Sequence, residues 1–146
     1  MSEADSLAAP TQDERTMAML AHVLQIFTWW IGPVVIFVVK QDSKFVRFHA
    51  LQALLWQVGL IVFWMIGMAV WFAAIFSTIF SAAGRTPPNQ APPVAMFVGF
   101  GLIWLLFMAG YLSNIVFGIV FGIKAGRGEW ACYPLVGRWA RHIVKV

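Results

Sequence analysis

Charged residues are scarce in this chain of 146 residues, and their scarcity excludes an ordinary water-soluble domain. Asp, Glu, Lys and Arg together make up 11% of the residues, 61% are hydrophobic, and the mean hydropathy is +0.80. A soluble domain carries about 25% charged residues because its surface faces water. We therefore expect a single-domain integral membrane protein whose main partner is the lipid bilayer.

Cysteine and an N-terminal positive charge are also nearly absent. Cys132 is the only cysteine, which excludes an intrachain disulfide. The N-terminus begins with Glu3 and Asp5 instead of the basic residues of a secretory signal, so the first apolar run should stay in the mature protein. The net charge of +4 does not indicate nucleic-acid binding, because the basic residues flank apolar runs, where they orient membrane proteins.

Three long apolar runs dominate the remainder. They cover about residues 17–39, 50–81 and 94–123. A helix needs roughly 20 apolar residues to cross the hydrocarbon core. The sequence thus predicts an all-α integral membrane protein with three long transmembrane helices and a short amphipathic C-terminal tail. Residues 1–10 are expected to be a disordered tail, and residues 11–146 a single multi-pass membrane domain.

The first run has two interpretations. Thr11-Gln12-Asp13-Glu14 matches a capping box, so a helix should begin near Gln12. Further along, Trp29-Trp30 lies in mid-run although interfacial tryptophans prefer the headgroup level, and Gly32-Pro33 can break a helix. The run is either one span or a broken, re-entrant pair of short helices, which would give four helices. The loop at residues 82–93 contains four prolines, so it cannot be helical throughout.

Lysine and arginine counts give the orientation. With three spans, the loop at residues 40–48 and the C-terminal tail share one side, which holds most of the basic residues. That side should be the cytoplasm, and the membrane a bacterial inner membrane.

Few polar residues lie within the apolar runs, and none of them is Asp, Glu, Lys or Arg. The packing candidates are His22, Gln25, His49, Gln57 and Asn114, with Glu129 in the tail. Gln57 and Asn114 lie at similar depth, about 10 Å and 15 Å from the cytoplasmic ends of their helices. We expect an interhelical hydrogen bond between them, either as a packing contact or as the lining of a polar path.

Small residues recur every four positions in the third run and just after it. They are Gly110, Gly118, Gly122 and Gly126, with Asn114 in register. Such a ladder lets helix backbones approach closely, so it should meet another helix or a second copy of the protein.

Signals for chemistry are missing. The histidines and Cys132 lack zinc-site spacing, and the sequence has no nucleophile elbow or P-loop. We expect no enzymatic activity, no metal and no cofactor.

Several short motifs carry a family resemblance. They are DERTMAMLAH at residues 13–22, FVRFHA at residues 45–50, and IKA, GE and YPL within residues 123–135. Together they resemble small bacterial membrane proteins related to the twenty-kilodalton subunit of the chloroplast inner-envelope protein translocon. The resemblance implies a multi-helical membrane protein with a link to protein translocation.

Two functional hypotheses follow. The first is a multi-pass membrane protein that acts by helix packing, as a subunit or accessory of a membrane assembly, with a second copy or other membrane proteins as partners. The alternative is a small channel or transporter-like protein, with Gln57 and Asn114 lining its path.

Overall fold

The computed structural model describes residues 9–83 and 94–146, and within these ranges it contains helices and no strand. The elements are α1 (Gln12–Thr28), α2 (Ile31–Val39), α3 (Lys44–Ala82), α4 (Val94–Gly126) and α5 (Gly137–Val144). The all-α prediction is confirmed for this part of the chain. Most of the expected disordered tail (residues 1–10) and of the proline-rich loop (residues 82–93) lies outside the described residues.

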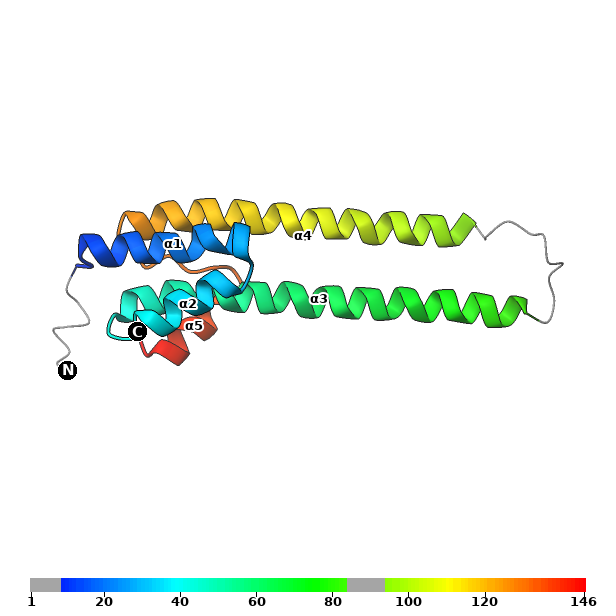
Figure 1. The fold of residues 1–146 in the computed structure, drawn as a ribbon, viewed down its shortest axis with the longest axis horizontal. Coiled ribbons are helices and arrows are strands. Elements are labelled where there is room, and N and C mark those ends of the chain that lie inside the picture. The colour runs from blue at the N-terminus through cyan, green and yellow to red at the C-terminus, as the bar shows by residue number, and fades with distance from the viewer. Residues whose placement is uncertain (1–8, 84–93) are drawn as a thin grey trace. The chain divides into compact units, whose positions relative to one another are not determined.

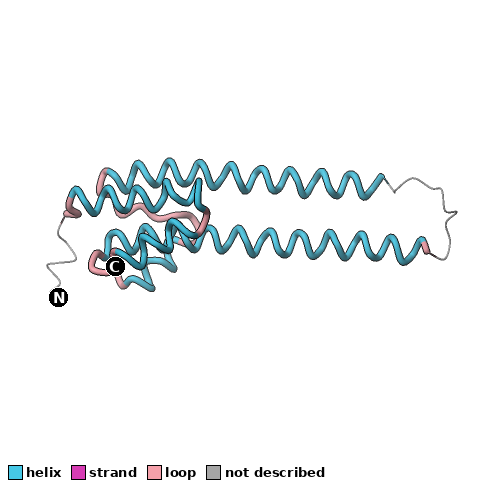
Figure 2. The backbone as a smooth tube through the Cα atoms, in the orientation of Figure 1, coloured by secondary structure: helices cyan, strands magenta, loops and turns pink. Residues whose placement is uncertain are grey.

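The chain divides into two compact units. The first combines Met1–Gly59 with Leu112–Val146, and the second is Leu60–Tyr111. In the first unit, α1 and α2 lie beside the last turns of α4 and the first turns of α3, and α5 follows the returning C-terminal segment (Figures 1 and 2). This unit holds the buried polar residues of the chain's described part.

Helix α1 begins where the capping box places it. The Thr11 hydroxyl accepts from the Glu14 backbone N–H at 3.2 Å, and the Glu14 carboxylate accepts from the Thr11 N–H at 2.7 Å. Two otherwise unpaired backbone groups at the helix start are thereby satisfied. The predicted start of this helix is confirmed.

The break in the first apolar run falls at Trp29-Trp30, earlier than the predicted Gly32-Pro33. Pro33 lies in the first turn of α2, where a missing N–H costs no hydrogen bond. The chain reverses instead at Trp29, which has a positive φ of 57°. Gly32 permits the reversal, because a Cβ there would collide with Leu24 and Thr28 of α1.

The reversal makes α1 and α2 a helical hairpin. Its two open ends meet, because the Lys40 ammonium after α2 contacts the Asp13 carboxylate in the first turn of α1 at 2.7 Å. With 17 and 9 residues, the two helices replace the expected first long span. The prediction of three long helices is therefore not confirmed, and the alternative of a split first run describes the fold.

Helices α3 and α4 are long and apolar enough to cross a membrane. The candidate spans are Lys44–Phe80 and Met96–Gly126, with hydropathies of 2.3 and 2.0. The most apolar window of α3 is 0% buried inside the protein, and that of α4 is 11% buried. Long apolar helices that stay exposed are typical of helices in contact with lipid, and these two are therefore candidate membrane spans.

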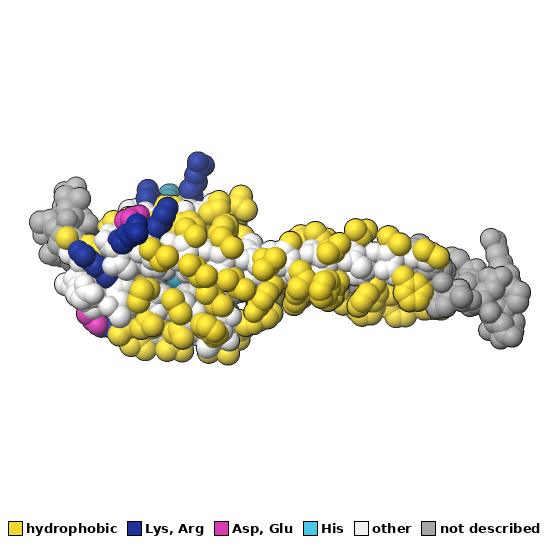
Figure 3. All heavy atoms as spheres, turned by 90° about the horizontal axis from the view of Figure 1, so that it is seen from above, with side chains coloured by type: hydrophobic (Ala, Val, Ile, Leu, Met, Phe, Trp, Pro, Cys, Tyr) yellow, Lys and Arg dark blue, Asp and Glu magenta, His cyan; other side chains and the backbone are white. Residues whose placement is uncertain are grey.

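The second unit contains the apolar stretches of both long helices. The Trp64 and Phe107 rings pack with centroids 4.9 Å apart, and the Trp71 and Phe100 rings 5.6 Å apart. Hydrophobic side chains cover the face of this unit seen in Figure 3. No Asp, Glu, Lys or Arg occurs in its described helical residues, which suits a surface in contact with lipid tails.

Candidate functional site

One face of α1 carries the first polar groups of the site. Ala18, Ala21, His22 and Gln25 are its buried residues, spaced at three and four positions as on one side of a helix. This face packs against α4 at glycines: a Cβ at Gly118 would lie 2.9 Å from the His22 carbonyl oxygen. The two helices approach closely enough for the α1 side chains to reach the interior of the first unit.

A pair of buried histidines lies at the centre. His22 Nε2 is 2.9 Å from His49 Nδ1, and His49 Nε2 is 3.0 Å from the backbone carbonyl oxygen of Glu129. A carbonyl only accepts, so His49 Nε2 must donate, and neutral His49 then accepts at Nδ1. His22 consequently donates from Nε2, which leaves its Nδ1 as an acceptor.

Tyr133 continues this chain of hydrogen bonds. Its hydroxyl is 2.9 Å from His22 Nδ1 and must donate to it, and it accepts from Gln25 Nε2 at 3.1 Å. The Glu129 carbonyl, which can only accept, thus fixes which atom donates in every hydrogen bond of this series back to Gln25. Burial raises the pKa of the Tyr133 phenol well above its usual value, so the hydroxyl remains protonated.

The amide side chains form a second set of hydrogen bonds in the same network. Gln57 Nε2 donates to Asn114 Oδ1 at 3.0 Å and to the Gln25 carbonyl oxygen at 2.9 Å. Gln25 Nε2 in turn lies 3.3 Å from the carbonyl oxygen of Asn114. The hydrogen bond predicted between Gln57 and Asn114 is present, and Gln25 connects the pair to α1.

Gln52 fixes the segment between α4 and α5. Its Nε2 donates to the Ala131 carbonyl at 3.1 Å, and its Oε1 accepts from the Tyr133 N–H at 2.6 Å. The Tyr133 ring packs against Phe121 with centroids 4.3 Å apart. A loop without secondary structure is thus held by side chains of α3 and α4, because its buried backbone groups need partners.

Charged groups form the outer edge of this unit. Besides the pair of Lys40 and Asp13, the Glu14 carboxylate accepts from the Ser43 hydroxyl at 2.6 Å. This hydrogen bond holds the pKa of Glu14 below its ordinary value, because it stabilises the charged form. The contact ties the first turn of α1 to the start of α3.

The arrangement is suited to holding helices together. The side chains of His22, Gln25, His49, Gln52, Gln57 and Asn114 are each at most 4% exposed. All of them have hydrogen-bond partners, and the partners come from α1, α3, α4 and the segment before α5. In the described ranges, no group of three or more His, Cys, Asp or Glu residues could hold a metal ion.

The structure brings together most of the residues singled out from the sequence. His22, Gln25, His49, Gln57 and Asn114 belong to one network. Glu129 joins it through its backbone carbonyl, while its side chain is exposed.

The glycines of the ladder contact two different helices. Gly118, Gly122 and Gly126 face His22, Ile26 and Met19 of α1, so their partner is a helix of the same chain. Gly110 faces Trp64 in the second unit.

Sequence reasoning missed two members of the network. Tyr133 and Gln52 are not among the packing candidates predicted from the sequence. A usable signal was the excess of polar groups: several amides and a histidine in apolar runs require more partners than the runs themselves supply. The C-terminal segment, with one of the two tyrosines of the chain, supplies them.

Comparison with known proteins gives one family. No curated protein and no solved structure matches the chain. A family model described as the magnetosome magnetite crystal formation protein family matches residues 13–140, which include α1 except its first residue, all of α2 to α4, and the first turn of α5. The resemblance to relatives of the chloroplast translocon subunit is therefore wrong, and the link to protein translocation falls with it. Short motifs such as DERTMAMLAH occur here within a different family's pattern, which extends over most of the chain: the protein belongs to the magnetosome magnetite crystal formation protein family.

Proposed function

We propose that this protein is a non-enzymatic, membrane-embedded accessory of magnetite crystal formation. The observation that carries the proposal is the family match over residues 13–140, which contains both candidate spans and the whole polar network. The protein would act as a fixed helical platform in the membrane where crystals form.

The hydrogen-bond network of buried polar residues supports a helix-packing role more than a path for solutes. Gln57 and Asn114, the two amides that could line a path, are 2% and 4% exposed, and they bond to each other. Their polar atoms are engaged in helix packing, as is common for amides within membranes. A path for solutes would need these groups to face an open space.

The hairpin suggests an orientation. Asp13 and Lys40 are paired, so the start of α1 and the end of α2 share one side of the membrane. Every lysine and arginine of the chain except Arg85 belongs to the first unit. By the positive-inside rule, we infer that the polar end of this unit and the C-terminus face the cytoplasm, in an inner membrane or a membrane derived from it.

Gene removal tests the proposal. The gene is deleted in its host, and the strain is complemented with the wild-type protein or with a Gly118→Leu variant, whose side chain would separate α1 from α4. Gly59→Leu is the matched control, because a Cβ at Gly59 meets no atom within 4 Å. Electron microscopy then gives crystal number, length and shape per cell.

We expect the deletion to alter crystal size or number, and the wild-type protein and the control to restore them. Gly118→Leu should not restore them. Crystals that are unchanged in number, length and shape after deletion would refute the proposal.

A further inference from the structure

Helix α5 has three distinct faces, and one of them is fixed to the protein. Gly137, Ala140 and Val144 are buried, and the last two pack against Phe48 and Leu51 of α3. At Gly137 a Cβ would lie 2.7 Å from Cys132 Cβ, so the helix begins in close contact with the preceding segment. The orientation of the other two faces of α5 relative to α3 is therefore fixed.

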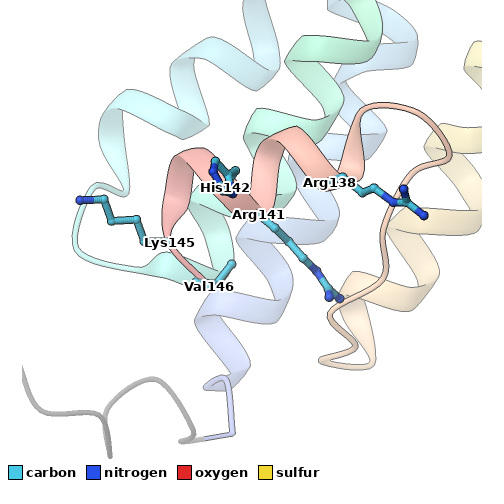
Figure 4. A pocket seen from close by; sticks show the side chains of 5 residues that line it. All are labelled: Arg138, Arg141, His142, Lys145 and Val146. Carbon is cyan, nitrogen blue, oxygen red and sulfur yellow. The ribbon is translucent and has the colours of Figure 1, made fainter.

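The second face is basic. Arg138, Arg141, His142 and Lys145 line an open pocket of about 480 Å³, together with Val146. Their side chains are exposed and spread along the helix; Figure 4 shows Arg138 and Arg141 extending to the same side and Lys145 toward the opposite end. The Lys44 ammonium adds a further positive charge, 3.5 Å from the Lys145 carbonyl oxygen.

In the part of the chain that the structure describes, no carboxylate forms an ion pair with these basic side chains. Within residues 9–83 and 94–146, the one ion pair joins Lys40 to Asp13. Arg141 donates to the backbone carbonyl of Trp130 at 3.3 Å, a contact that leaves its charge uncompensated. Basic side chains without carboxylate partners are complementary to an anion.

The third face is apolar and faces outward. Leu135 is 84% exposed, Trp139 67% and Ile143 56%. Trp139 and Ile143 are four residues apart on the helix, directly beside the basic face. A small soluble anion would need no such apolar neighbours, whereas a lipid headgroup brings acyl chains with it.

We propose that α5 forms a binding site for an anionic phospholipid. Arg138 and Arg141 would bind the headgroup phosphate, Lys145 would add to the positive charge of this face, and Trp139 and Ile143 would contact the upper part of the acyl chains. Because the buried face fixes α5 on α3, the lipid would be held at a set position on the first unit and not merely attracted to a mobile tail. The proposal is independent of a role in magnetite formation.

Lipid titration of the full-length protein tests it. The purified protein in a neutral detergent is titrated with phosphatidylglycerol or phosphatidylcholine, and native mass spectrometry counts the bound lipids. The test variant is Arg138→Gln/Lys145→Gln, whose two side chains have no bond within the described chain. The charge-matched control is Lys124→Gln/Arg127→Gln, outside the pocket.

We expect the wild-type protein to prefer phosphatidylglycerol. The test variant should lose roughly 30-fold in affinity for it, since each basic residue at a lipid surface contributes about fivefold. The control should lose less than about threefold. Equal binding of the two lipids, or equal loss in both variants, would overturn the proposal. If the double variant unfolds, Arg138→Gln alone should still lose about fivefold.

Two further measurements distinguish a lipid site from a site for free phosphate. Trp139→Ser/Ile143→Ser keeps every charge and should weaken phosphatidylglycerol binding by about tenfold, because part of the apolar contact is lost. Inorganic phosphate should not displace the lipid. If this variant binds like the wild type and inorganic phosphate displaces the lipid, the pocket is a simple anion site and the lipid proposal is wrong.

Discussion

Packing of α1 on α4 through glycine gives the sharpest prediction for stability. A Cβ at Gly118 would lie 2.7 Å from Ile26 Cγ1 and 2.9 Å from the His22 backbone oxygen. One helical turn away, a Cβ at Gly122 would lie 3.6 Å from its nearest neighbour, the His22 Cβ, at an ordinary contact distance. The same substitution at these two positions should therefore have different effects.

The magnitude follows from the neighbours. At Gly118 a backbone atom blocks the new methyl group, so α1 must shift, and overpacking of this kind typically costs about 1–3 kcal/mol. At Gly122 there is no collision, and alanine only gains in helix propensity over glycine, by up to about 1 kcal/mol. Because the propensity gain applies at both positions, Gly118→Ala should be less stable than Gly122→Ala by about 1–3 kcal/mol.

Reversible unfolding measures this difference. Each full-length variant is unfolded by increasing the fraction of sodium dodecyl sulfate in mixed micelles, and circular dichroism reports the helix content. Equal free energies of unfolding for the two alanine variants would refute the close contact between α1 and α4. Gly59→Ala should behave like Gly122→Ala, since a Cβ at Gly59 meets open space.

Three further results are expected. In a double-mutant cycle of Gln57→Leu and Asn114→Leu, the same unfolding assay should give a coupling of about 0.6 kcal/mol, and zero coupling would contradict their hydrogen bond. The depressed pKa of Glu14 contributes stability that is complete above its ordinary pKa and is lost as the pH falls through the lower, folded-state pKa. The thermal midpoint should thus drop below about pH 4.5, and Glu14→Gln should reduce this dependence; identical pH profiles would exclude the contribution. Single cysteines at the exposed positions Gln12 and Gln41, in a cysteine-free background, should both resist an impermeant thiol reagent in intact cells and react after lysis; label at only one of them would restore a three-span topology.

Local signals in the sequence were sufficient for some elements. The start of α1 was predictable because Thr11 and Glu14 satisfy each other's backbone groups within one turn. The two long apolar helices were predictable because an apolar run of more than 20 residues indicates a helix long enough to cross a membrane, whatever the tertiary contacts.

The position of the break in the first apolar run was harder to predict from the sequence. Gly32-Pro33 drew attention because proline breaks helices, but proline is tolerated in a first turn, and Pro33 occupies that place in α2. The reversal depends on Trp29 at positive φ and on contact between Gly32 and α1, which are tertiary features.

Most of the network was visible as a list of residues but not as an arrangement. Depth along the helices was enough to pair Gln57 with Asn114. It could not pair His22 with His49, since their contact requires α1 to fold back beside α3. Tyr133 enters only because the segment before α5 returns over α3, held there by Gln52.

The central claim is that this membrane-embedded chain takes part in magnetite crystal formation, and co-precipitation in vitro tests it most directly. Magnetite is precipitated from ferrous and ferric salts in the presence of liposomes that contain the full-length protein. Empty liposomes, and liposomes with an unrelated helical membrane protein at equal density, are the controls. We predict that the crystal size distribution shifts only in the preparation whose liposomes contain this protein. Crystals with the same size and shape in all three preparations would contradict a direct role in their formation.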